Sequence, residues 1–270
     1  MLSLCINKFK NVLMILLIGM LLMGNTNTMT NNIREAKDHL SNSIRNVVIQ
    51  SVLSEDEIQT FAARKAQVVI RCGEYEGKAG KRVYLDDIKL HFKDIPTDIK
   101  IHTDSRGVYV HEYDLNKKIS MRIYEKMQER GIKVVYQDTK NKSEDLNRAG
   151  RIANEMNANI YLSIHTNYYD SNAKGFFIMS NEGNQQARKI ADRLSSSIAN
   201  NGMIPQREAL LNNGRIGEMN TINDSTIALL LEAGFYSNPD ELKYLMSDEY
   251  AEYIANNLAN EMENVLNDIK

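Results

Sequence analysis

The sequence predicts an α/β domain in which buried strands alternate with helices. Two apolar runs, residues 160–164 and 225–231, are rich in strand-forming residues and have the length of strands inside a sheet. Residues 114–130 and 143–156 instead repeat their apolar positions at helical spacing. Strand, helix and strand in this order predict parallel crossovers. With 270 residues, the chain is long enough for one good-sized core and a flanking segment.

The N-terminus has the composition of an export signal. Lys8 and Lys10 precede an apolar run over residues 12–24. A basic segment followed by a short apolar core is typical of a secretion signal, and this core is shorter than the roughly 20 residues of a membrane span. No A-x-A pattern follows it, so an uncleaved membrane anchor is the alternative. We therefore expect an exported chain, either released or anchored in the membrane.

This interpretation of the N-terminus divides the chain into three parts. Residues 1–25 are a signal peptide or membrane anchor, residues 26–65 are a helical spacer, and residues 66–270 are a single main domain. The main domain begins with a strand at 66–72, a hairpin of 83–85 with 88–92, and a strand at 99–102. Further strands are expected at 132–136, 160–167 and 175–179, and further helices at 184–200, 240–246 and 249–269. The polar stretch 204–221 is expected to be a surface loop that lines a cleft.

Composition excludes some partners and cross-links. The formal charge is −2 and no basic stripe is present, so nothing favours a nucleic-acid partner. Of the two cysteines, Cys5 lies in the leader, so the main domain has no internal disulfide. The remaining Cys72 is expected to be a small buried apolar residue.

Three ionisable residues stand where chemistry is expected. His165 and Glu232 each follow a buried strand, and ligands of open α/β sheets bind at the carboxyl ends of strands. Burial would raise the pKa of Glu232, which suits a general base, although a salt bridge or a cap at the strand end is the structural alternative. Glu112 precedes a helix, where the helix dipole by itself favours an acid. Together, one His and two Glu form a set typical of zinc hydrolases.

Several stretches of the sequence resemble the motifs of one enzyme family. Residues 145–154 (DLNRAGRIAN), 161–167 (YLSIHTN) and 231–238 (LEAGFYSN) resemble motifs of the zinc-dependent N-acetylmuramoyl-L-alanine amidases, which are cell-wall hydrolases. Residues 112–118 are similar to that family's ligand glutamate and following helix. The resemblance covers roughly residues 68–269, and implies a twisted mixed sheet with helices on both faces.

The resemblance also implies a role for each matched residue. His165 and Glu112 would be zinc ligands, and Glu232 would be the catalytic base that takes a proton from the water at the zinc. The substrate would be peptidoglycan, cut at the amide bond between the lactyl group of muramic acid and L-alanine.

One departure from the family pattern concerns the third zinc ligand. Family members carry a Gly-His-Gly-like motif after the first strand, whereas residues 68–74 (VVIRCGE) place Glu74 at the matching position. The ligand is then Glu74, His91 from the expected hairpin, or His102 at the end of a strand; otherwise zinc is weakly bound or absent. We favour His102, because imidazole suits zinc and its strand-end position mirrors that of His165.

Two other functions compete with the zinc amidase. The missing histidine motif favours a catalytically inactive peptidoglycan-binding or regulatory module on the amidase scaffold. The third hypothesis is a metal-dependent hydrolase of another substrate, because a fold does not determine the substrate.

Overall fold

The computed structural model describes residues 66–74, 80–89, 96, 98–138, 148–200 and 202–269. The expected leader, the helical spacer and His91 lie outside these residues. No helix within the described ranges has both the length and the apolar character needed to cross a membrane.

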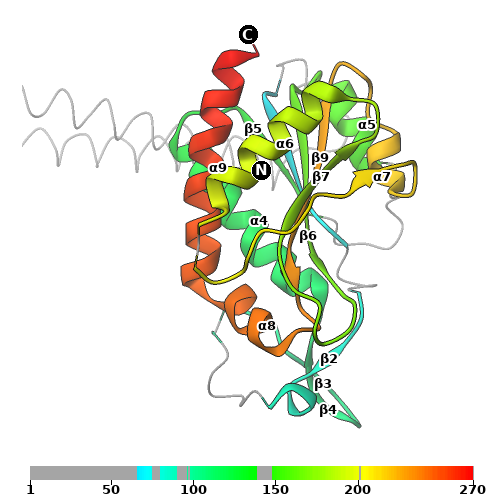
Figure 1. The fold of residues 1–270 in the computed structure, drawn as a ribbon, viewed down its shortest axis with the longest axis vertical. Helices are drawn as coiled ribbons and strands as arrows, with labels where there is room; N and C mark the ends of the chain where they lie inside the picture. Colours follow the sequence, from blue (N-terminus) through cyan, green and yellow to red (C-terminus); the bar gives the residue numbers. More distant parts are fainter. Residues whose placement is uncertain are drawn as a thin grey trace, which may run out of the picture. The chain divides into compact units, whose positions relative to one another are not determined.

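A six-stranded mixed sheet, in the order β5-β1-β6-β9-β7-β8, forms the centre of the domain (Figure 1). Its strands are β1 (Val68–Cys72), β5 (Val134–Gln137), β6 (Ile160–Asn167), β7 (Phe177–Asn181), β8 (Leu211–Asn212) and β9 (Ile227–Phe235). Strands β5, β1, β6 and β9 are parallel, whereas β7 runs antiparallel to β9. The expected α/β class, mixed sheet and parallel crossovers are confirmed.

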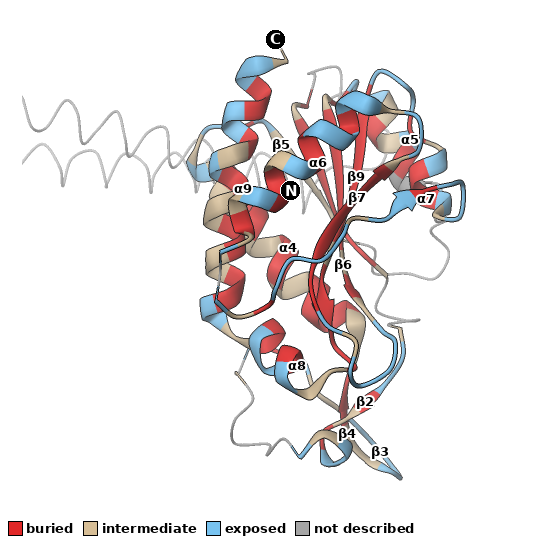
Figure 2. Ribbon diagram, in the orientation of Figure 1, coloured by how far each residue is buried: buried red, intermediate tan, exposed pale blue. Residues whose placement is uncertain are grey.

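Helices cover both faces of this sheet, as expected (Figure 1). One face carries α4 (Glu112–Glu129), α6 (Gln185–Ile198), α8 (Pro239–Met246) and α9 (Asp248–Asp268). The other face carries the short helices α5 (Arg148–Glu155) and α7 (Gly217–Asn220). The central strands are buried along most of their length (Figure 2), which explains why their sequences are continuous apolar runs.

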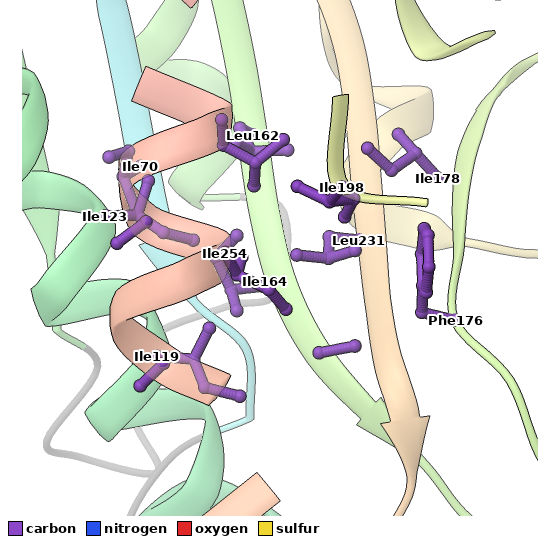
Figure 3. Packing of buried hydrophobic residues seen from close by; sticks show 14 of the residues in the cluster. Ile70, Ile119, Ile123, Leu162, Ile164, Phe176, Ile178, Ile198, Leu231 and Ile254 are labelled. Carbon is purple, nitrogen blue, oxygen red and sulfur yellow. The ribbon is translucent and has the colours of Figure 1, made fainter. Parts of the chain in front are cut away.

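Alternating side chains of the strands fill two separate cores. Ile70, Leu162 and Leu231 pack toward α4 and α9, where Ile123 and Ile254 meet them (Figure 3). On the opposite face, the neighbouring strand positions pack with α5 and α7 in a smaller core; Val69, Tyr161 and Leu230 belong to it. Because the pleat has a period of two, His165 lies on the same face as Tyr161, and Glu232 on the same face as Leu230.

A second, three-stranded antiparallel sheet contains the first strand of the expected hairpin, whereas residues 90–92 of its expected second strand lie outside the described residues. It has the order β2-β4-β3, with β2 (Val83–Tyr84), β3 (His102–Asp104) and β4 (Gly107–Val110). Residues Asp86–Ile88 form a 3-10 turn rather than the start of a second hairpin strand, and Lys89 closes the turn in the left-handed conformation with φ 54°. β2 therefore pairs with β4. The strand predicted at 99–102 is displaced: Ile99 N–H donates to the Pro96 carbonyl in a turn, and the strand begins only at His102.

Two short elements also occupy the stretch that was expected to be a loop. β8 and α7 lie within residues 204–221. Their shortness explains why periodicity did not predict them, since two to four residues contain no full repeat.

Candidate metal centre and active site

The parallel register of three strands brings the candidate residues to one edge of the sheet. Cys72 of β1 pairs with Ile164 of β6, and His165 of β6 pairs with Glu232 of β9. Gly73 N–H then donates to the Ile164 carbonyl at 2.8 Å, which carries the β1–β6 pairing past the end of β1 and up to Glu74. The carboxyl edge is where ligands bind in open α/β sheets.

Three side chains at this edge could hold a metal ion. Potential ligand atoms of Glu74, Glu112 and His165 all lie within 4.8 Å of one another. His165 Nδ1 is 3.0 Å from Glu112 Oε1, and the buried Glu74 Oε2 has no hydrogen-bond partner among the described residues. An imidazole and two carboxylates are donors that zinc accepts, and three protein ligands leave a position open for water. The residues therefore fit the metal that the sequence motifs imply.

The backbone around Glu74 is shaped for this close approach. Glu74 has φ 58°, a left-handed conformation that costs a residue with a side chain roughly 1–2 kcal/mol. The preceding Gly73 lies directly against the ring of His165: a Cβ at Gly73 would be 2.5 Å from both His165 Cδ2 and Nε2. Glycine at this position lets the end of β1 pass the imidazole.

Asn116 holds Glu112 in place from one turn further along α4. Its side-chain amide donates to Glu112 Oε1 and to the Gly73 carbonyl, both at 3.1 Å. Its own oxygen accepts a hydrogen bond from the Thr166 hydroxyl at 3.0 Å. This fully buried amide thereby ties α4, the end of β1 and β6 to one another at the site.

Glu232 lies beside these three residues in an unusual electrostatic setting. Burial raises the pKa of the Glu232 carboxyl to about 8; the neighbouring carboxylates of Glu112, Glu218 and Glu74 add to this shift, and His165 opposes it. Its buried Oε2 has no partner in the described part of the chain. A carboxyl group with these properties can accept and return a proton near neutral pH.

A further acidic residue, Glu218, lies beside His165 in the structure; the sequence analysis did not identify it as a candidate. This buried carboxylate of α7 lies 3.2 Å from His165 Nε2 through Oε1 and forms an ion pair with buried Arg71 through Oε2. Burial alone would raise the pKa of Glu218, but Arg71 and the His165 hydrogen bond lower it to about 2. Only the apolar neighbours Ile216 and Met219 hinted that this acid would be buried.

The imidazole of His165 is consequently held between two carboxylates. Burial by itself would lower the pKa of His165, but the hydrogen bonds to Glu112 and Glu218 raise it well above its ordinary value. Both ring nitrogens of His165 thus face a carboxylate oxygen, and a metal ion bound at one nitrogen would take the place of a proton there.

His102, favoured above as the third ligand, lies elsewhere in the structure. Its Nε2 is 2.9 Å from Asp114 Oδ2, and its ring stacks on Tyr109 in the three-stranded sheet. It does not join the group formed by Glu74, Glu112 and His165. Because His102 begins β3 rather than ending a strand of the large sheet, it lacks the strand-end position that motivated the choice.

One family model and several solved structures match this chain. The family model described as N-acetylmuramoyl-L-alanine amidase matches residues 101–264, which is more than half of the chain. The match includes Glu112, His165 and Glu232 but begins after Glu74. A search among curated proteins finds no match.

Solved amidase structures share the fold. N-acetylmuramoyl-L-alanine amidase AmiC2 of Nostoc punctiforme is 19% identical with a TM-score of 0.58, covering 75% of this chain and 98% of its own. The catalytic domain of CwlV from Bacillus (Paenibacillus) polymyxa var. colistinus is 20% identical with a TM-score of 0.58, covering 76% and 99%. An N-acetylmuramoyl-L-alanine amidase from Clostridium difficile 630 is 20% identical with a TM-score of 0.56, covering 76% and 98%.

These structural likenesses show the fold, and the family match over residues 101–264 shows the lineage. The chain belongs to the N-acetylmuramoyl-L-alanine amidase family, whose enzymes hydrolyse an amide bond of peptidoglycan.

Proposed function

We propose that this amidase is zinc-dependent and hydrolyses the amide bond between the lactyl group of N-acetylmuramic acid and L-alanine. The metal ligands are Glu74, Glu112 and His165, and the catalytic base is Glu232. The observation that carries this proposal is the convergence of three ligand atoms within 4.8 Å of one another, next to a buried carboxyl oxygen without a partner among the described residues.

In the proposed reaction, Glu232 carries out the proton transfers. A zinc ion bound here supplies a Lewis acid that polarises the scissile carbonyl and makes water more acidic. Glu232 takes a proton from the attacking water, whose oxygen forms a bond to the lactyl carbonyl carbon. When the carbon–nitrogen bond breaks, Glu232 returns that proton to the departing amine of L-alanine. The products are a lactyl carboxylate and a free amino terminus.

Metal content is the first test of the ligand set. Elemental analysis of the purified, zinc-reconstituted chain should find about one zinc per molecule, because a site of this kind holds a single ion. Glu74→Ala, Glu112→Ala and His165→Ala should each lose most of it. His102→Ala is the matched control, since it removes an imidazole that Asp114 holds outside the group. Loss of zinc in His102→Ala with retention in Glu74→Ala would overturn the assignment.

Product analysis tests the reaction. Purified peptidoglycan treated with the enzyme should gain free L-alanine amino termini, detected by mass spectrometry of the released stem peptides. Glu232→Gln should keep the zinc and lose this activity, because an amide cannot accept the proton. Binding without any release of L-alanine termini would instead support the inactive binding module.

We also propose that residues 1–25 export the chain and that residues 26–65 separate this leader from the catalytic domain, residues 66–270. The basic and apolar composition of the leader supports export, and the peptidoglycan substrate lies outside the cytoplasmic membrane. Intact-mass measurement of the chain recovered from cells would show whether the leader is removed. A full-length chain found only in the cytoplasm would contradict the proposal.

A further inference from the structure

Buried charged side chains connect His165 of β6 to the neighbouring strand β1. His165 Nε2 lies 3.2 Å from Glu218 Oε1, and the second oxygen of Glu218 pairs with Arg71 of β1. The side chains of Arg71 and Glu218 are only 3% and 5% exposed. Isolated buried charges are costly, so two charged groups at this depth need a compensating arrangement.

The short helix that carries Glu218 is fixed from several directions. A Cβ on Gly150 of α5 would meet the Thr221 hydroxyl and would lie 3.1 Å from the Glu218 carbonyl, so only glycine allows α5 to pack this closely. The amide of Asn154 donates to the Thr221 carbonyl at 2.7 Å. The Asn212 side chain of β8 accepts a hydrogen bond from Ile216 N–H at 3.0 Å. Glu218 is therefore presented to His165 by a rigid support.

We propose that Glu218 and Arg71 are positioning residues that prepare His165 to bind the metal through Nδ1. This inference rests on the metal site proposed above. Nδ1 faces Glu112, a fellow ligand, whereas Nε2 faces Glu218. A carboxylate that accepts the Nε2–H bond fixes both the tautomer and the ring orientation of a metal-binding histidine, and such partners typically contribute 10–100-fold to metal affinity.

Arg71 holds one oxygen of Glu218, so that the other oxygen stays directed toward His165. Glu218 has Arg71 on one oxygen and His165 on the other, so neither oxygen is free to reach toward the ion. This geometry separates Glu218 from Glu74, whose buried Oε2 has no partner among the described residues. Arg71 and Glu218 thus act on the metal only through His165.

The test compares metal affinity with folding stability in four variants of the full chain. Zinc affinity is measured by competition with a chromophoric chelator, and stability by urea unfolding of the metal-free protein. Glu218→Gln removes the negative charge of the side chain that lies within hydrogen-bond distance of His165 Nε2. The double variant Arg71→Met/Glu218→Gln removes the buried ion pair entirely. Arg71→Met alone isolates the contribution of the guanidinium. Glu241→Gln is the matched control, a buried carboxylate that accepts hydrogen bonds from Gly175 and Phe235 N–H groups away from His165.

We expect Glu218→Gln to weaken zinc binding about 10–100-fold. The double variant should regain stability relative to Glu218→Gln, because no unpaired guanidinium remains, yet it should bind zinc no better. Glu241→Gln should lower stability and leave zinc affinity unchanged.

Two results would overturn the positioning role while leaving the metal site intact. One is unchanged zinc affinity in Glu218→Gln; the other is recovery of affinity together with stability in the double variant, which would mark a purely structural ion pair. Absence of zinc binding by the unmodified chain would refute the metal site itself and, with it, this inference.

Discussion

Replacing Gly73 by alanine tests the close approach on which the whole site depends. The added Cβ would lie 2.5 Å from His165 Cδ2 and Nε2, whereas ordinary contact begins at 3.4 Å. The ring or the strand end must therefore move by about 0.9 Å, the difference between these two distances. The same Cβ meets the Ile164 carbonyl, which accepts the Gly73 N–H bond at 2.8 Å.

A displacement of this size has two measurable consequences. The His165 Nε2–Glu218 Oε1 distance is already 3.2 Å, so a ring movement of 0.9 Å away from Glu218 would exceed the limit of about 3.5 Å for a hydrogen bond. Forced repacking of this kind costs about 1–3 kcal/mol of unfolding free energy, or roughly 2–12 °C in melting temperature for a domain of this size. Misplacing a catalytic group by 1 Å lowers the rate on the order of 100-fold.

The assays are thermal unfolding, zinc affinity and release of L-alanine termini from peptidoglycan. Gly131→Ala is the control: it has φ 73°, so alanine there is strained, but no atom lies within 4 Å of the added Cβ. We expect it to lower stability by about 1 kcal/mol with zinc affinity unchanged. Wild-type zinc affinity and activity in Gly73→Ala would refute the steric reasoning.

Three further predictions concern the core, the metal and the thiol. Leu162→Ala empties a fully buried position between β6 and the helices, and should cost about 2–5 kcal/mol of unfolding free energy in urea titrations; a cost below 1 kcal/mol would contradict the packing shown here. Zinc at 100 times its dissociation constant should stabilise the fold by about 2.7 kcal/mol, and Glu112→Ala should lose this increment in calorimetry. Cys72 is fully buried and its pKa is raised to about 12, chiefly by burial, so in the Cys5→Ser variant a thiol reagent should label it only upon unfolding; rapid labelling of the native protein would disprove this.

Much of the fold and part of the site were predictable because their signals are local. The apolar runs before His165 and Glu232 identified two buried strands, and the structure confirms both. The pattern placed each residue at the end of a buried strand, whereas the pairing that sets His165 opposite Glu232 comes from the sheet register. The family motifs pointed to Glu112, which the structure brings beside His165.

The third member of the group formed with Glu112 and His165 depended on contacts that no local pattern encodes. Glu74 and His102 were both candidates, and the choice between them rests on where β1 ends and which strand contains His102. The turn at Ile99 and the pairing of β3 with β4 hold His102 against Asp114, whereas Gly73 lets Glu74 reach His165. Imidazole chemistry favoured His102, but that argument contained no information on strand pairing.

The sequence by itself determined the class of fold, the two strand-end residues and the amidase motifs, because periodicity and short motifs are properties of consecutive residues. Only the tertiary structure decided that Glu74 joins Glu112 and His165, and that Glu218 and Arg71 lie behind the imidazole. Arg71 and Glu218 are 147 positions apart, and their pairing depends on α5, β8 and the sheet register together. Contacts at such separations arise from packing, which a one-dimensional pattern does not contain.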